Sequence, residues 1–225
     1  ADHDAATRGS RPPTWRPVTH EATLPRYRVA VSVQIHPVPG LPEIAPGDDL
    51  AAMIIDAARA AGTPIIDDDI VVVTSKIVSK AEGRTVELDD ITPGAFAREW
   101  SQRWEKDPRV VEVVLAESAR VVRQLGPVLI TETHHGFICA NSGVDQSSSG
   151  AHGRLVLLPV DPDASARTIR AGFAAAGVLA AVIISDTFGR PWREGQTDIA
   201  IGVAGMAPMR SYIGEVDPHG HEFRV

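Results

Sequence analysis

The stretch that decides the fold is Val178-Leu179-Ala180-Ala181-Val182-Ile183-Ile184-Ser185-Asp186. Residues 178–184 are almost continuously apolar, which is typical of a strand that is buried on both faces of a sheet. The preceding residues 163–176 read as a helix, and Gly177 is well placed to end it. We therefore expect Asp186 to emerge, rigidly held, at the carboxyl end of a buried strand.

Other elements follow outward from this stretch. Residues 50–61 have the apolar spacing of a helix, which Gly62 would end. A long polar and helical region covers residues 93–120, and it places Trp100 and Trp104 on one helix face, where core or interface packing is the commoner role. Strands mixed with helices imply an α/β or α+β fold. The other expected strands are residues 29–33, 70–74, 128–131, 137–140 and 155–158.

Size and charge limit the class of protein. The 225 residues are enough for one sizeable domain or two small lobes around a shared core. The 22 basic and 29 acidic side chains give a net charge of −7, which argues against a nucleic-acid binder that works by neutralising phosphates. Residues 1–28 carry four prolines without sustained periodicity and are expected to form a flexible tail.

Cys139 is the single cysteine, so an intrachain disulfide is excluded. Its neighbours are apolar, which favours a buried small side chain over a catalytic thiol activated by His134 or His135. The sequence has no apolar run of roughly 18 residues and no signal-peptide core at its start. The cytoplasm is the expected location.

Polar groups follow the predicted buried strand in residues 185–193, which read Ser-Asp-Thr-Phe-Gly-Arg-Pro-Trp-Arg. Asp186 and Thr187 offer two oxygen ligands of the kind that hard divalent cations bind, and Arg190 and Arg193 suit phosphate or carboxylate. A turn in which the aspartate pairs with its own arginine explains the spacing equally well. The spacing alone leaves both interpretations open.

A second acid, Asp145, lies in a loop after the strand expected at residues 137–140. Gly143 permits tight backbone geometry in this loop, and an ordinary Asx turn is the simplest interpretation. If Asp145 converged with Asp186, the two would form the carboxylate clamp that metal-assisted phosphoryl chemistry uses.

Two lysines, Lys76 and Lys80, follow the strand expected at residues 70–74. They would share one side of a helix, where ammonium groups and helix amides suit a polyphosphate. A solvated charged face is the alternative. The chain has neither a P-loop nor a dinucleotide-binding glycine motif, so a nucleotide site must be of another kind.

Four motifs in this order, at residues 39–43, 74–83, 140–145 and 185–196, resemble the coenzyme F420-0:L-glutamate ligase family. The resemblance covers roughly residues 31–225. It implies an α+β fold with mixed sheets and packed helices, and an intertwined homodimer. It also implies that residues 29–225 are the ligase domain without the carboxyl-terminal segment that other members carry.

The resemblance implies a GTP-dependent ligase that attaches L-glutamate to coenzyme F420-0 through a gamma-glutamyl linkage. Two Mg²⁺ or Mn²⁺ sites and a K⁺ requirement are implied with it. Because an unactivated carboxylate does not acylate an amine readily, we expect an acyl-phosphate intermediate made from GTP.

Site residues are carried over by position within the matching motifs. Asp145, Asp186 and Lys80 are implied to be catalytic, and Ser148 replaces an asparagine that contacts nucleotide in the family. The implied GTP contacts are Leu41, Pro42, Glu43, Ile44, Ser75, Lys80 and Ser148, and the implied metal ligands are Asp145, Asp186 and Thr187.

Two alternatives use the same residues. A metal-dependent phosphotransferase or phosphohydrolase acting on another anionic metabolite would need the same aspartates and lysines. A non-catalytic module that binds a nucleotide or a deazaflavin is the other alternative, and it predicts binding without turnover.

Overall fold

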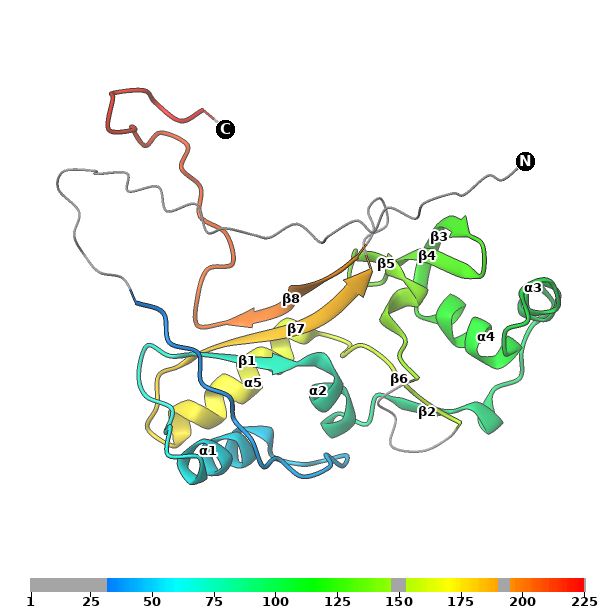
Figure 1. Cartoon of the computed structure of the whole chain (residues 1–225), viewed down its shortest axis with the longest axis horizontal. Helices are drawn as coiled ribbons and strands as arrows, with labels where there is room; N and C mark the ends of the chain where they lie inside the picture. Colours follow the sequence, from blue (N-terminus) through cyan, green and yellow to red (C-terminus); the bar gives the residue numbers. More distant parts are fainter. Residues whose placement is uncertain (1–31, 147–152, 190–194, 225) are drawn as a thin grey trace, which may run out of the picture. The chain divides into compact units, whose positions relative to one another are not determined.

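The computed structural model describes residues 32–146, 153–189 and 195–224 (Figure 1). The chain divides into residues 1–35 and residues 36–225, and the fold below is that of the second part. The predicted tail, most of the strand expected at residues 29–33, and the site candidates Ser148, Arg190 and Arg193 lie outside the described residues. Residues 32 and 33, the described end of that predicted strand, are not in a strand.

The described residues form an α+β fold with five α-helices and three small sheets (Figure 1). In the central sheet, β1 (Ile70–Thr74) pairs in parallel with β7 (Ala181–Gly189), and β8 (Gln196–Ala204) pairs antiparallel with β7. The strand predicted from the apolar run at residues 178–184 therefore begins later and continues further than expected. Backbone pairing with β8, which the sequence analysis missed, extends β7 beyond the apolar run.

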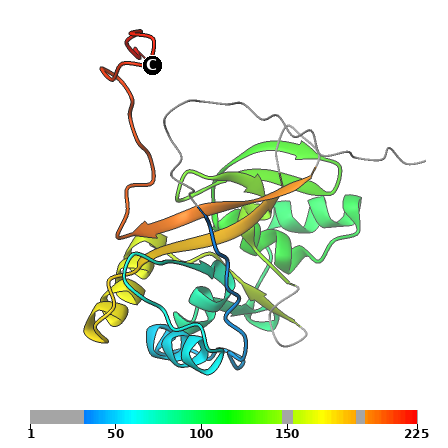
Figure 2. The ribbon, with the colours of Figure 1, turned by 60° about the vertical axis from the view of Figure 1, so that its left-hand side comes forward.

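Helices α1 (Leu50–Ala60) and α5 (Pro162–Ala175) lie together on one side of the central sheet (Figures 1 and 2). Both predicted helices are confirmed to within two residues. Asp49 caps α1 by accepting a hydrogen bond from the backbone N–H of Ala52. The two helices pack closely because Gly172 has no side chain: a Cβ there would lie 2.4 Å from the Cβ of Ala51.

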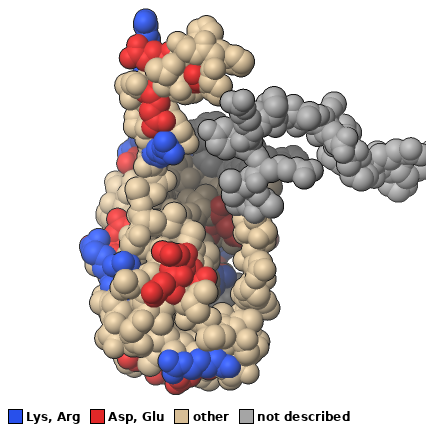
Figure 3. All heavy atoms as spheres, turned by 90° about the vertical axis from the view of Figure 1, so that its left-hand side faces the viewer, with Lys and Arg blue, Asp and Glu red and all other residues tan. Residues whose placement is uncertain are grey.

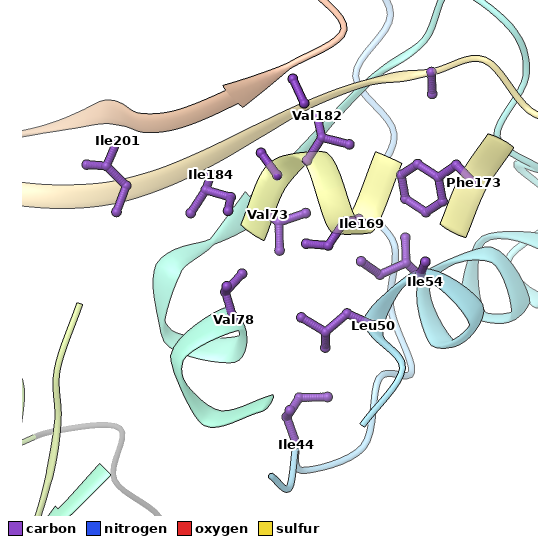
Figure 4. Close-up of a cluster of buried hydrophobic side chains, with 14 of the residues drawn as sticks. Ile44, Leu50, Ile54, Val73, Val78, Ile169, Phe173, Val182, Ile184 and Ile201 are labelled. Atoms are coloured by element: carbon purple, nitrogen blue, oxygen red, sulfur yellow. The ribbon is translucent and has the colours of Figure 1, made fainter. Parts of the chain in front are cut away.

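The main core fills the space between this sheet and the helices (Figure 4). Phe173, Val182 and Ile184 are fully buried there. Burying one side chain of this kind contributes about 1.5–3 kcal/mol of transfer free energy, so this core fixes where β7 lies. The labelled side chains in Figure 4 are Ile44, Leu50, Ile54, Val73, Val78, Ile169, Phe173, Val182, Ile184 and Ile201.

Helix α2 (Ser75–Ala81) begins directly after β1 ends. Because α2 is helical, Lys76 and Lys80 lie on one side of it, as the sequence predicted for a helix after this strand. Val78 and Ser79 of α2 are buried, so the helix is anchored to the core by its opposite face.

The helical region predicted at residues 93–120 is wrong as a single unit. It contains α3 (Ala95–Trp104) and α4 (Pro108–Ala116), separated where Glu105 adopts φ 52° and Pro108 starts a new helix. Trp100 and Trp104 pack in a small second core, as the helix-face spacing predicted.

Strand β3 (Ser118–Leu125), which the sequence analysis missed, follows α4 and forms an antiparallel sheet with β4 (Val128–Thr133) and β5 (Ile138–Ala140). The third sheet pairs β2 (Thr85–Glu87) with β6 (Arg154–Val156). The strand expected at 155–158 therefore lies slightly earlier than predicted. Two short 3₁₀ turns, Leu88–Asp90 and Asn141–Gly143, complete the described elements.

The surface on the side drawn in Figure 3 carries a compact group of acidic side chains, with basic side chains in separate small groups. The acidic group on this face is consistent with the net charge of −7. Among the helices that the structure describes, none is long and apolar enough to span a bilayer.

Candidate active site

Asp186 lies where β7 stops pairing with β1 and continues to pair with β8 alone. β1 ends at Thr74, which is opposite Ser185, so Asp186 is the first residue of β7 beyond its parallel neighbour. Because β7 continues to Gly189, Asp186 is inside the strand and not at its end, which corrects the prediction. Strand alternation directs its side chain to the face that Val182 and Ile184 share, toward α2.

The Asp186 carboxylate accepts a hydrogen bond of 2.5 Å from the hydroxyl of Ser75, the first residue of α2. Burial raises the pKa of Asp186, the Ser75 hydrogen bond and the positive charge of Lys76 oppose that rise, and the negative charge of Asp145 adds to it. Two predicted site residues, Ser75 and Asp186, are thus in direct contact. The structure also brings Asp145 close enough to act on Asp186.

Asp145 is fixed through its backbone. Its N–H donates to the carbonyl of Val156 at 2.9 Å and its carbonyl accepts from the N–H of Val156 at 2.8 Å, so it adds a bridge to β6. The turn just before it has three consecutive residues with positive φ, Asn141, Ser142 and Gly143. A Cβ at Gly143 would lie 2.9 Å from side-chain atoms of Leu158, so only glycine fits there.

Buried hydroxyls hold this turn in place. The Ser142 N–H donates to the Thr131 hydroxyl at 2.9 Å, and the Ser142 hydroxyl lies 2.7 Å from that of Thr131 and 2.6 Å from that of Ser118. Ser142 and Thr131 are buried, and buried hydroxyls stabilise a structure only when they are paired. The network explains how a polar loop presents Asp145 rigidly.

Lys76 connects the two aspartates electrostatically. Its ammonium nitrogen lies 2.8 Å from Oδ2 of Asp145, and its charge also lowers the pKa of Asp186. The sequence pattern links Lys76 only with Lys80, because the contact with Asp145 spans 69 residues and leaves no local pattern. Residues of α2, β7 and the 141–145 turn therefore meet at one place.

The predicted nucleotide loop, residues 41–44, lies against the other end of α2. The Lys80 ammonium is 2.6 Å from Oε1 of Glu43, and the Lys80 side chain is only 13% exposed. Ile44 is buried in the main core and Leu41 packs against it, while Pro42 and Glu43 are exposed. The loop can therefore offer its backbone, Pro42 and Glu43 to a ligand, with its apolar ends serving as anchors.

Thr187 points away from this cluster. Adjacent strand residues face opposite sides of a sheet, and the Thr187 hydroxyl donates to Oδ1 of Asp198 on β8 at 2.5 Å. Asp198 was not among the predicted site residues. The structure brings Asp145, Asp186, Ser75 and Lys76 together and leaves Thr187 on the other face.

Cys139 is buried, as its apolar neighbours predicted. Burial and the charge of Asp186 raise the pKa of its thiol to about 12. The two histidines considered as its partners instead contact backbone carbonyls, His134 at Ala116 and His135 at Pro159. A thiolate nucleophile is therefore disfavoured at neutral pH.

The donor set suits a hard divalent cation that keeps part of its water. Asp145 and Asp186 supply two carboxylates, and no group of three or more His, Cys, Asp or Glu side chains gathers for metal binding in the part of the chain that the structure describes. Mg²⁺ is typically bound by one or two carboxylates together with water and substrate phosphate, whereas structural zinc needs four protein ligands. The residues present fit Mg²⁺ or Mn²⁺.

A cavity of about 160 Å³ lies elsewhere, between α3, α4 and the outer side of the 141–146 segment. It contains none of the predicted site residues. Its lining includes Trp100, Lys106, Val111, Leu129, Asn141 and Gln146.

Comparison with known proteins places the chain in a family. Residues 40–225 match the model of a family described as F420-0:Gamma-glutamyl ligase. The chain is 43% identical over 189 residues to the coenzyme F420:L-glutamate ligase of Methanothermobacter thermautotrophicus, with 84% of this chain and 75% of that protein covered. Ligases of the same name from Methanopyrus kandleri, 41% identical over 195 residues (86% and 75% covered), and Halobacterium salinarum, 43% over 194 (84% and 73%), are also similar.

Proposed function

Because the chain belongs to the F420-0:gamma-glutamyl ligase family, we propose that it joins L-glutamate to coenzyme F420-0 through a gamma-glutamyl linkage. The observation that carries the proposal is the meeting of Asp145, Asp186 and Lys76 beside α2. The register of Thr74 with Ser185 places Asp186 beside the start of α2, and the bridge from Asp145 to Val156 holds Asp145.

We propose Asp145 and Asp186 as ligands of one Mg²⁺ or Mn²⁺. A divalent ion bound there would offset the charge of a transferring phosphoryl group. Ser75 orients Asp186 through its 2.5 Å hydrogen bond, and the backbone bridge to Val156 orients Asp145. A second ion at Thr187 and a K⁺ requirement remain predictions from the family resemblance, and the Thr187 hydroxyl would first have to leave Asp198.

GTP is the proposed co-substrate, held between the 41–44 loop and α2. Lys80 is the proposed phosphate contact, since its side chain is only 13% exposed and its ammonium nitrogen lies 2.6 Å from Oε1 of the exposed Glu43. Exchanging an exposed carboxylate partner for a phosphate keeps that ammonium paired. The closeness of Glu43 to Lys80 supports a shared role for the loop and the helix.

The proposed reaction has two steps. A carboxylate oxygen of F420-0 attacks the γ-phosphorus of GTP, the bond to the β-phosphate oxygen breaks, and GDP leaves with that electron pair. The amine of L-glutamate then attacks the acyl phosphate carbon, loses a proton, and expels inorganic phosphate. In this scheme the chain's own residues position the substrates and offset the negative charge of the phosphates, with Lys80 as the phosphate contact. No enzyme nucleophile is needed, in keeping with the protonated Cys139.

A homodimer is also proposed. One face of β1 leaves Ile70 and Val72 more than half exposed, while Val73 on the opposite face is buried. The segment after β8 exposes further apolar side chains, including Met209 and Ile213. A second copy of the chain would cover these surfaces. Val72→Glu should shift the mass measured by light scattering toward the monomer, and an unchanged mass would contradict this surface as the interface.

The test of the ligase proposal is mass spectrometry of F420-0 incubated with GTP, L-glutamate and Mn²⁺. We expect a mass gain of one glutamyl unit, and no gain when GTP or glutamate is left out. GTP hydrolysis that needs neither F420-0 nor glutamate, with no glutamyl product, would favour the phosphohydrolase alternative. Binding of F420-0 without any product would favour the non-catalytic alternative, and either result overturns the ligase proposal.

A further inference from the structure

Lys76 forms an ion pair with Asp145, one of the two aspartates of the proposed site. Its ammonium nitrogen lies 2.8 Å from Asp145, and the exposed fractions of the two side chains are 36% and 25%. Its charge also acts on Asp186. One lysine of α2 therefore serves two aspartates, one from the 141–145 turn and one from β7.

The other lysines have different surroundings. The chain contains three lysines, Lys76, Lys80 and Lys106. Lys80 is paired with Glu43, and Lys106 is exposed in the connection between α3 and α4. Of the three lysines, Lys76 is therefore the one that α2 places beside Asp145.

Two carboxylates held near each other repel unless a cation lies between them. An ammonium nitrogen 2.8 Å from a carboxylate oxygen lies close to where a cation bound to that oxygen would lie. A divalent ion and an ammonium group repel at such a separation, so the two cannot both keep full contact with Asp145. Lysine suits an exchange of this kind, because its flexible stem lets the ammonium group move to water.

We propose that Lys76 is the resident counter-ion of the Asp145–Asp186 pair: it holds the carboxylates together in the metal-free protein and must release Asp145 when a divalent cation binds. The inference rests on the proposed function in that the cation is the one proposed there for Asp145 and Asp186. It makes Lys76 a positioning residue, whose effect is measured as a change in metal affinity and not only in turnover.

The test is a titration of the nucleotide-free full chain with Mn²⁺, followed by calorimetry. Lys76→Met keeps the length of the side chain and removes its charge, and Lys106→Met is the matched control. We expect Lys76→Met to bind Mn²⁺ on the order of tenfold more tightly than the wild type, because the competing charge is gone. Lys106→Met should bind as the wild type does, and Asp145→Asn should bind much more weakly.

Thermal unfolding gives a second, independent readout. Without metal, Lys76→Met should unfold at a lower temperature than Lys106→Met, because the aspartates lose their counter-ion. Saturating Mn²⁺ should raise the unfolding temperature of Lys76→Met by more than that of the wild type.

The outcomes separate this inference from the proposed function. A wild type that forms the glutamyl product, together with a Lys76→Met variant whose Mn²⁺ affinity is unchanged or weaker, would overturn the role of Lys76 and leave the ligase proposal in place. Tighter Mn²⁺ binding by Lys76→Met without any glutamyl product would support the counter-ion and overturn the ligase. Absence of both Mn²⁺ binding and product in the wild type would overturn both.

Discussion

Two aspartates, Asp107 before α4 and Asp186 in β7, are held in opposite electrostatic settings. Asp107 accepts hydrogen bonds from the backbone and side chain of Arg109, and these lower its pKa. Asp186 is buried near another carboxylate, and its pKa is raised. The Asp107 carboxylate is bound by Arg109, two residues away, whereas Asp186 depends on residues from α2 and the 141–145 turn.

The Asp107 carboxylate stabilises the fold, whereas the fold holds the Asp186 carboxylate at a cost in stability. Asp107 caps a helix and is paired locally, so its charge favours the folded state. Asp186 is held charged against burial, which lowers the stability of the metal-free protein. Groups of the second kind are typical of functional sites.

Asp186→Asn should give the largest effect. The amide can still accept the Ser75 hydrogen bond but carries no charge for a cation, so we expect ligase turnover to fall by about 10³-fold or more. The free energy of unfolding without metal should rise, because the buried charge is removed. Product assays and urea unfolding check both, and an active variant would remove Asp186 from the site.

Gly143→Ala tests how strongly the turn before Asp145 is constrained. The new Cβ would meet Leu158 at 2.9 Å in a residue with φ 69°, so we expect a loss of about 2–4 kcal/mol in stability. Gly136→Ala is the control, because its φ is 87° and nothing lies within 4 Å of the new Cβ. Equal losses in the two variants would show that contact with Leu158 does not constrain the turn.

Asp107→Ala should have a moderate effect on stability alone. Loss of the helix cap and of the Arg109 contacts should lower the free energy of unfolding by about 1 kcal/mol. Asp107→Asn retains a capping oxygen and should lose less. Turnover per folded molecule should match the wild type, and a large loss of turnover would mean that α4 contributes to the site.

The pH dependence of stability should run in opposite directions for the two aspartates. The folded pKa of Asp107 is lowered, so its contribution is present above the unfolded value near ~3.9 and is lost as the pH falls through the folded pKa. The folded pKa of Asp186 is raised, so Asp186 does not lower the free energy of unfolding below that unfolded value. It lowers this free energy increasingly as the pH rises to the folded pKa. Unfolding of each Asn variant against the wild type, across acidic pH without metal, should show these opposite slopes, and parallel slopes would contradict the comparison.

The same contrast explains what the sequence could predict. α1, α5 and β1 were predicted because apolar spacing and caps such as Asp49 are local signals. β3 was missed because Arg120, Arg123 and Gln124 interrupt its apolar residues, and β8 because it begins with Gln-Thr-Asp; pairing with β4 and β7 defines the two strands. Their existence depends on partners and not on their own composition.

In the site, too, local features were predicted and contacts between distant segments were missed. Asp145 and Asp186 were predicted as candidates from their loops, but their meeting depends on the parallel pairing of β1 with β7 and on the bridge from Asp145 to Val156. Lys76 and Asp198 were missed as partners because their contacts join segments that are distant or unrecognised in sequence.

The most direct test of the central claim is Mn²⁺ binding to the wild type, Asp186→Asn and Asp107→Asn, measured by calorimetry without nucleotide. If Asp186 and Asp145 form a cation site, the wild type and Asp107→Asn should bind Mn²⁺ with equal affinity and Asp186→Asn should bind at least tenfold more weakly. Equal Mn²⁺ affinity in Asp186→Asn and the wild type would contradict the claim.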